Sequence, residues 1–340
     1  MNKLLAALLL AAAPLAHAGA SDAGASKLAV PHGWKIVDRI PIGGDTRWDL
    51  MQLDPAAHRL YVSHGSQTEV IDTRTDKLVG TIADTHGVHG IAIASELGRG
   101  FTSDGKDDAL TEFDLATLKP LRTIKVGANP DVVVYDPATR RVLSFNGHSK
   151  DVSVVDAEHG TVVGTVAVGG KPELAVLARD GHVWFNVEDT GELAEFDPKA
   201  MKIASRRRLA GCEEPTGLAV DDRGRFYSGC GNKAMVVSGA DGARLGSATI
   251  GAGVDGVAWQ DGFAFSANGA DGTISVVEED PFGHFVTAWT VATALGARTI
   301  VGDAALHRLY LPTAEFKPAA EGQRPVAVPG SAVVLVVEKY

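Results

Sequence analysis

Seven positions that recur about every 41 residues carry the side chains best suited to chemistry. They are Asp49, His89, Asp131, Glu173, Thr216, Asp255 and Arg298. Asp is common at a turn into a strand, but turn formation does not require ionisable groups at nearly every one of these positions. If the seven side chains meet, they form a ring that binds a small ligand or a protein partner. The alternative is a hydrated polar channel that holds no ligand.

A second group of polar residues stands where the following strand of each repeat is expected to end. Its members are His64, Asp104, Asn146, Asn186 and Asn268, with His148 two residues beyond Asn146. Mixed oxygen and nitrogen ligands suit a divalent cation. The candidate metal ligands are therefore His64, His86, His89, Asp131 and Glu173. Because no HExxH motif and no EF-hand loop is present, solvated histidines without a metal are the alternative.

Motifs of the common enzyme classes are missing. The sequence has no GxSxG elbow, no P-loop and no GxGxxG that opens a helix. It has no CxxCH, which excludes covalent c-type haem, and no CxxC pair for a thiolate zinc site. The net charge of -10 argues against a nucleic-acid partner. The basic run 206–208 is better explained as a charged sheet edge. No catalytic residue is identified.

The elements that position these residues follow from the repeats. Arg59-Leu60-Tyr61 recurs in related form at Arg141, Arg225 and Arg308, and Asp-Pro turns precede the first two of these arginines. Each repeat contains short Val- and Thr-rich runs bounded by Gly, Pro, Asn and Asp, which are strand signals. Four strands in about 40–45 residues form one propeller blade. The sequence predicts an all-β, seven-bladed β-propeller with four-stranded blades, over residues 34–340.

The two ends of this region complement each other. The last repeat ends after a third strand, and residues 34–42 resemble the fourth strand of the other blades. We therefore expect the last blade to be closed by the N-terminal strand, which leaves no open edge in the propeller.

The chain begins with features of a secretory signal. Lys3 precedes an apolar run of about ten residues, which is too short for a membrane span. The run is followed by Ala16-His17-Ala18, which fits a signal-peptide cleavage site. We predict a signal peptide at 1–18, a linker at 19–33, and export to the periplasm or beyond. No later segment is apolar enough to cross a membrane, and a monomer is expected.

Export bears on the two cysteines. In an oxidising compartment, two thiols in one chain usually pair. Cys212 enters the inner strand of the fifth repeat and Cys230 ends its second strand, so both fall on one face of a blade. We predict a disulfide between Cys212 and Cys230.

The repeat resembles that of a known family. The segments 54–63, 70–75 and 81–82 are similar to the YVTN-family propeller repeat, and residues 296–299 and 307–316 resemble exported bacterial YncE-like members. The resemblance covers roughly residues 34–340. It implies the propeller fold and an exported location more than any reaction. The fourth to sixth repeats depart from the pattern, as at Asp221-Asp222, where the family has Asp-Pro.

Two functional classes follow. The first is an exported propeller that binds a ligand or protein at the channel-mouth face, to which the Pro-rich loop 312–331 also belongs. The second is a metal-assisted, lactonase-like hydrolase, with His89 as base and Arg298 as anion anchor, by analogy of fold. No cofactor other than a possible divalent cation is expected.

Overall fold

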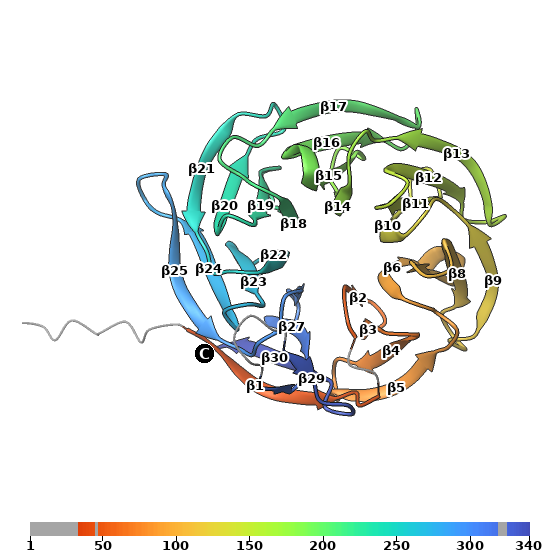
Figure 1. The fold of residues 1–340 in the computed structure, drawn as a ribbon, viewed down its shortest axis with the longest axis horizontal. Coiled ribbons are helices and arrows are strands. Elements are labelled where there is room, and N and C mark those ends of the chain that lie inside the picture. The colour runs from red at the N-terminus through yellow and green to blue at the C-terminus, as the bar shows by residue number, and fades with distance from the viewer. Residues whose placement is uncertain (1–32, 45–46, 319–324) are drawn as a thin grey trace, which may run out of the picture. The chain divides into compact units, whose positions relative to one another are not determined.

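The computed structural model describes residues 33–44, 47–318 and 325–340. Within Gly33–Tyr340, a single compact unit, seven four-stranded sheets surround a central channel (Figure 1). This confirms the predicted all-β, seven-bladed propeller. The predicted signal peptide (1–18), and the predicted linker up to residue 32, lie outside the described residues.

In the first six blades, four antiparallel strands follow one another from the channel to the rim. The first three blades are β2 (Met51–Asp54), β3 (Arg59–His64), β4 (Gln67–Asp72) and β5 (Lys77–Ile82); β6 (Val88–Ala94), β7 (Arg99–Asp104), β8 (Ala109–Asp114) and β9 (Pro120–Lys125); β10 (Pro130–Asp136), β11 (Arg141–Asn146), β12 (Asp151–Asp156) and β13 (Thr161–Ala167). The next three are β14 (Pro172–Leu177), β15 (Val183–Val187), β16 (Glu192–Asp197) and β17 (Lys202–Arg208); β18 (Pro215–Val220), β19 (Phe226–Cys230), β20 (Ala234–Ser238) and β21 (Arg244–Thr249); β22 (Val254–Gln260), β23 (Phe263–Asn268), β24 (Thr273–Glu279) and β25 (Phe285–Ala292).

The seventh blade combines both ends of the described chain. It consists of β26 (Val301–Asp303), β27 (Arg308–Thr313), β30 (Val333–Lys339) and β1 (Trp34–Pro41), which is the outer strand. Strand β1 runs antiparallel to β30, with Trp34 opposite Lys339 and Pro41 opposite Val333. Trp34 is buried and packs edge-on against Phe265 of the sixth blade. The predicted closure by the N-terminal strand is confirmed.

The turn between the first and second strands explains part of the repeat. At its start a buried aspartate accepts hydrogen bonds from backbone N–H groups of the turn; these aspartates are Asp54, Asp136, Asp221 and Asp303. Only the first two precede proline. The carboxylate therefore holds the turn where the family-like Asp-Pro pair is absent, because Asp side chains readily satisfy turn N–H groups.

The arginine at or just before the start of the second strand joins neighbouring blades. Arg59, Arg141, Arg225 and Arg308 each donate a hydrogen bond to the blade that follows. The acceptors are, in the same order, the backbone oxygens of Leu115 and Pro198 and the carboxylates of Glu279 and Asp76. The Arg308 contact crosses from the seventh blade to the first, so it adds a side-chain link where the chain closes.

The two cysteines are joined, as predicted. Cys212 lies in the connection from β17 to β18, and Cys230 ends β19. Their Cα atoms are 5.2 Å apart, a normal disulfide separation. Both residues are buried. The bridge ties the entrance of the fifth blade to the end of its second strand.

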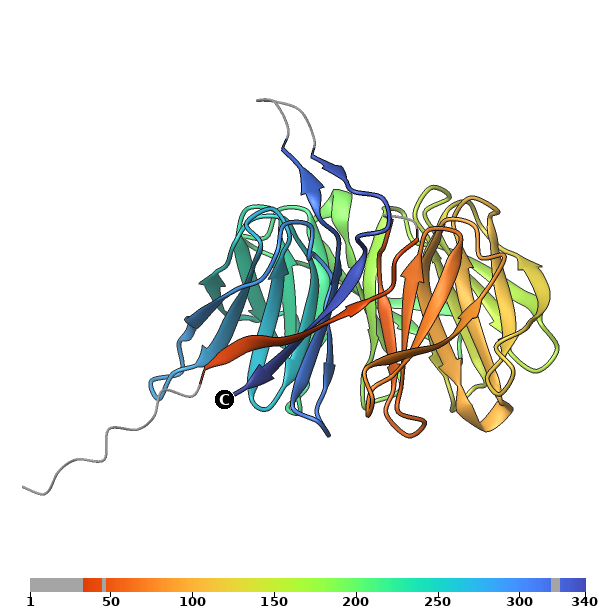
Figure 2. The same cartoon turned by 90° about the horizontal axis from the view of Figure 1, so that it is seen from below.

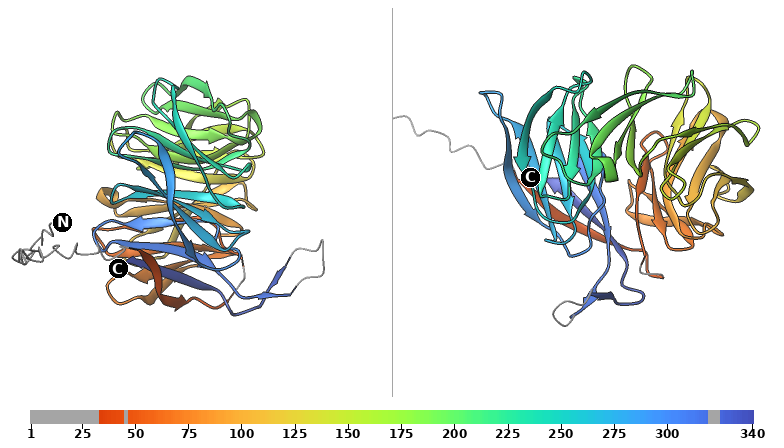
Figure 3. Two further views of the ribbon diagram at one scale, coloured as in Figure 1. Left: turned by 90° about the vertical axis from the view of Figure 1, so that its left-hand side faces the viewer. Right: turned by 45° about the horizontal axis from the view of Figure 1, so that its top comes forward.

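The long loop of the last blade contains a small hairpin. Strand β28 (Phe316–Lys317) pairs with β29 (Val326–Ala327), and the two rise from one face of the propeller (Figure 2; Figure 3). Two single-turn 3-10 segments, η1 (Ser95–Leu97) and η2 (Glu188–Thr190), also occur. Over residues 33–44, 47–318 and 325–340, no helix is long and apolar enough to span a membrane.

Closure by β1 gives a testable consequence. A chain that begins at Gly43 lacks β1 and exposes the edge of β30, so it should unfold at a clearly lower temperature than the chain from residue 19. Trp34→Ala alone should lower the free energy of unfolding by about 3–5 kcal/mol, because it removes a buried aromatic ring. Thermal and urea unfolding measure both effects. A chain that begins at Gly33 is the matched control, and equal stability of all three chains would refute the role assigned to β1.

Candidate functional site

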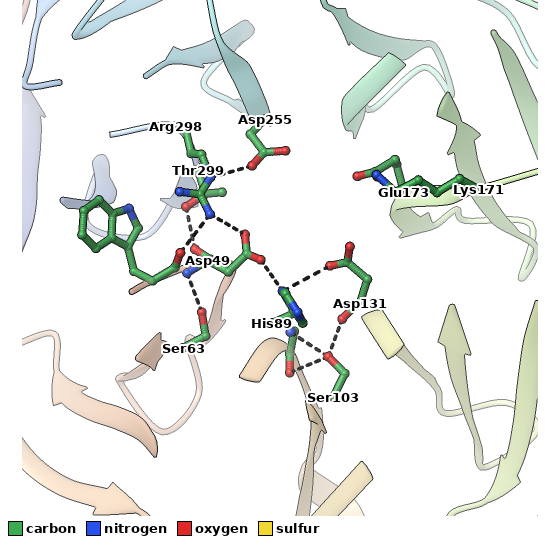
Figure 4. Close-up of polar contacts among 12 residues, drawn as sticks. Asp49, Ser63, His89, Ser103, Asp131, Lys171, Glu173, Asp255, Arg298 and Thr299 are labelled. Atoms are coloured by element: carbon green, nitrogen blue, oxygen red, sulfur yellow. Dashed lines mark hydrogen bonds and ion pairs between the residues drawn. The ribbon is translucent and has the colours of Figure 1, made fainter. Parts of the chain in front are cut away.

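The seven residues predicted from the repeat, here called the channel-mouth ring, stand at or just before the start of the inner strands. In five blades the first residue of the inner strand is paired with the second strand. The register then shifts before the next paired residue, and the ring residue lies in this interval. In the third blade, for example, Pro130 pairs with Asn146, and regular pairing resumes at Val133. Such an irregularity redirects the side chain between the paired residues. Asp131 therefore turns towards the channel (Figure 4).

Close packing between neighbouring inner strands fixes the level of the ring residues along the channel axis. A Cβ atom on Gly90, the residue after His89, would lie 2.8 Å from the backbone oxygen of Asp131. Only glycine fits there. The hydroxyl of Ser103 accepts a hydrogen bond from the Gly90 N–H at 2.7 Å and donates one to the same Asp131 oxygen. The starts of two inner strands are thus held side by side.

Five residues of the ring form one continuous polar network (Figure 4). The Nδ1 atom of His89 lies 2.6 Å from a carboxylate oxygen of Asp49 and 3.9 Å from one of Asp131. Arg298 Nε donates to Asp255 at 2.8 Å, and its Nη2 lies 3.5 Å from the other oxygen of Asp49. Asp49 therefore connects the histidine to the arginine.

The remaining two ring residues behave differently. Glu173 forms an ion pair with Lys171 at 2.6 Å, and Lys171 also pairs with Glu188. The Thr216 hydroxyl donates to the backbone oxygen of Val254 at 3.0 Å, so it joins two blades. Lys171 was not among the predicted residues. Its position two residues before Glu173 is the signal that could have identified it.

Burial and crowding of like charges shift the proton affinities of the ring. Burial, reinforced by the charge of Asp49, raises the pKa of Asp131 and of Asp255. Burial and the charge of Asp131 raise the pKa of Glu173. Burial alone would lower the pKa of His89, but its hydrogen bond to Asp49 and the charge of Asp131 raise it overall. The ring therefore attracts positive charge, whether as protons or as a ligand.

The second group of predicted residues does not join the ring. His64, Asp104, Asn146, Asn186 and Asn268 are all buried at the ends of second strands. Asn146 accepts from Ser144 and donates to Ser153, and Asn268 makes the same pair of contacts with Ser266 and Ser275. Asn186 instead donates to the backbone of the next blade. These contacts fasten strands together because buried polar groups need partners.

The predicted metal ligands are only partly brought together. His64 contacts Glu69 inside its blade, His86 contacts Asp107 at the surface, and His148 is exposed. Among the described residues, two groups place three ligand atoms within 4.8 Å of one another: Asp49, His89 and Asp131; and Asp180, His182 and Glu195. Glu173 belongs to neither group. A metal at the ring would therefore use Asp49, which was not among the predicted metal ligands.

A pocket of about 760 Å³, here called the mouth pocket, lies between the ring and the hairpin β28–β29. Its floor includes Asp49, His89 and Arg298. Its wall includes Trp48 and Phe316, whose rings meet edge-to-face with centroids 6.0 Å apart. Neither aromatic residue was singled out from the sequence. Trp48 directly precedes a ring position, and Phe316 is the aromatic residue of the long loop; these are the signals that could have identified them.

Comparisons with known proteins support the fold alone. No protein-family model and no curated protein matches the sequence. A chain of hydrazine synthase from Kuenenia stuttgartiensis is similar, with a TM-score of 0.69 and 12% identity over 79% of this chain and 92% of that chain. The structure titled U3-55K has a TM-score of 0.74 and 10% identity, over 89% of this chain and 99% of that one. The RRP9 WD40 repeats also have a TM-score of 0.74 and 10% identity, over 90% and 97%.

The buried Asp104 should make stability depend on pH. Burial raises its pKa to about 7, and hydrogen bonds from Thr111 and Thr102 offset only part of that rise. An unfolded Asp titrates near pH 4, so the stability that Asp104 contributes is present below that pH and is lost as pH rises through 7. Asp104→Asn, which installs the residue found at Asn146 and Asn268, should raise the free energy of unfolding by roughly 2–3 kcal/mol more at pH 8 than at pH 5, because about two of the three pH units between the unfolded and folded pKa values lie above pH 5.

Urea unfolding at the two pH values measures this difference. Asp84→Asn, at an exposed position in the connection from β5 to β6, is the control and should have little effect at either pH. An Asp104→Asn effect of the same size at pH 5 and pH 8 would contradict the assigned pKa.

Proposed function

We propose that this chain is a ligand-binding propeller of the YVTN, YncE-like kind, exported from the cytoplasm, whose ligand occupies the mouth pocket. The observation that carries the proposal is the composition of this pocket. It combines ring residues that can form ion pairs and hydrogen bonds with an aromatic wall contributed by Trp48 and Phe316. Concave sites with an apolar wall and a few convergent polar groups are typical of small-molecule sites.

The fold and the sequence add support. Propellers of the WD40 kind, to which the described residues are structurally similar, commonly serve as binding scaffolds. The N-terminal features at Lys3 and 16–18 support export. The hairpin interrupts the second-to-third strand connection of one blade only, which places an additional wall beside the ring without disturbing the other six blades.

A substitution at the hairpin tests the proposal. A thermal-shift screen of small amines, carboxylates, sugars and nucleotides on the mature chain identifies ligands. Phe316→Ala should weaken the binding of such ligands at least about tenfold, because an aromatic wall is lost, and should leave the unfolding temperature without ligand nearly unchanged. Phe282→Ala is the matched control, since Phe282 is 85% exposed at the β24–β25 turn. The proposal fails if no compound raises the unfolding temperature, or if affinities are insensitive to Phe316.

A second candidate function rests on the Asp49, His89 and Asp131 group. A divalent cation held there would polarise a carbonyl and lower the pKa of bound water, as a metal-assisted hydrolase requires. Arg298, beside the group, would anchor an anionic part of a substrate. The geometry sets one limit. Nδ1 of His89 is the atom that faces both aspartates, so His89 cannot be a ligand and a base through that atom at once.

Titration with Zn²⁺ and Ca²⁺ separates the two candidates. If the hydrolase candidate is right, one ion should bind per chain, Asp131→Asn should weaken it at least about tenfold, and the loaded protein should hydrolyse lactones. Asp180→Asn, in the other three-ligand group, is the matched control. Metal binding that depends on Asp180 and not on Asp131, or a loaded protein without hydrolytic activity, would exclude this candidate.

A further inference from the structure

The channel below the ring contains a cavity of about 330 Å³, here called the shaft, lined by aliphatic side chains together with polar groups such as Gln52 and Thr299. Its wall is built by the inner strands and includes Leu50, Ile93, Val134, Leu174, Leu177 and Ile300. All six are half-buried: each packs on one side against a core cluster and leaves the rest of its surface accessible in the cavity. Aliphatic surface left accessible in a cavity is a free-energy cost that an apolar ligand can remove.

A smaller cavity of about 160 Å³, here called the ring chamber, lies at the upper end of the shaft. Its polar lining consists of Asp49, Asp131, Glu173, Asp255 and Lys171. It shares Leu50, Val132 and Leu174 with the shaft, so the two cavities adjoin. It also shares Asp49 with the mouth pocket. A molecule that enters from the mouth meets carboxylates first and aliphatic side chains beyond them.

Basic groups do not balance the carboxylates at this level. The carboxylates that face the ring or its basic residues are Asp49, Asp131, Glu173, Glu188 and Asp255. The basic partners are His89, Lys171 and Arg298, and each is shared between two carboxylates. A bound cation would supply the missing positive charge, whereas an anion would meet four carboxylates in a small space.

The spacing of the carboxylates selects the kind of cation. Glu173 and Asp255 belong to no group of three ligand atoms within 4.8 Å among the described residues, so they do not form a compact metal site with Asp131. An ammonium group needs no compact set of ligand atoms, because its charge attracts carboxylates at longer range and its N–H donors can reach them directly or through water.

We propose that the channel binds a primary alkylammonium ion, with its ammonium group in the ring chamber and its aliphatic chain in the shaft. This inference rests on the proposed function and specifies the class of ligand. The ammonium lies among the carboxylates of Asp131, Glu173 and Asp255 and donates hydrogen bonds to them directly or through water. The chain covers the half-buried aliphatic side chains of the inner strands. Binding is reversible and involves no covalent step.

The test uses the mature chain and two matched series of ligands. Butyl-, hexyl- and octylamine are titrated by calorimetry below their micellar concentrations, beside the carboxylates of the same chain lengths. The amines should bind, with an affinity that rises roughly three- to fourfold for each added methylene. The carboxylates should bind at least tenfold more weakly. Carboxylates that bind as tightly as amines, or amine affinities independent of chain length, would overturn the proposal.

Two substitutions locate the ammonium group. Glu173→Gln and Asp255→Asn should each weaken octylamine at least about fivefold while the increment per methylene stays the same, because the shaft is unaltered. Asp222→Asn, at a 78% exposed position, is the matched control. An unchanged octylamine affinity in both chamber variants would overturn the placement of the ammonium.

The outcomes distinguish this inference from the function on which it rests. If neither series binds while a compound from the screen still depends on Phe316, the alkylammonium inference fails and the mouth pocket remains a binding site. If octylamine binds with the expected dependence on chain length while no ligand depends on Phe316, the channel and not the mouth pocket is the binding site.

Discussion

The pairing of β1 with β30 is the interaction on which the rest of the molecule depends. Each blade packs only against its two neighbours, so the channel exists as a closed space only if the last blade is completed and meets the first. The strand Trp34–Pro41 supplies the missing edge, and Arg308 carries a contact from the seventh blade to Asp76 of the first. The distances among the ring residues follow from this closure, since Asp49 and Arg298 belong to the two blades that meet there.

Polar residues of similar type have two roles that differ by strand. At the starts of inner strands His89 and Asp131 turn into the channel, where one histidine serves the carboxylates of both Asp49 and Asp131. At the ends of second strands Asn146 and Asn268 are buried and have local partners. The difference arises from the register shift in the inner strand, which turns one residue out of the sheet. The second strands pair without a register shift with the third strands, and their last residues stay within the blade.

Much of this arrangement could be predicted from the sequence. The repeat fixes the strand order, and the strand order fixes the level of each residue along the channel axis. The propeller, the role of Trp34–Pro41, the disulfide of Cys212 and Cys230 and the positions of the seven ring residues all followed from that periodicity. Trp48 and Phe316 did not, because their contact joins two blades and no single repeat encodes it. Lys171 was missed because its ion pairs with Glu173 and Glu188 lie within one blade, outside the seven ring positions. His64 and His86 were grouped by residue type, yet one lies inside a blade and the other at the surface.

Completion of the last blade from both ends of the described chain also has a consequence for the order of folding. While β30 is still unfolded, β1 has no partner, and the six preceding blades can form without closing the channel. The final step therefore joins the segments of greatest sequence separation, which is the slowest kind of contact to form. Until β30 has folded, β1 and the open edge of β27 have no partner strand, and both can pair with β30 of another copy. Exchange of β1 between two chains is thus the characteristic route by which this propeller would misassemble at high concentration.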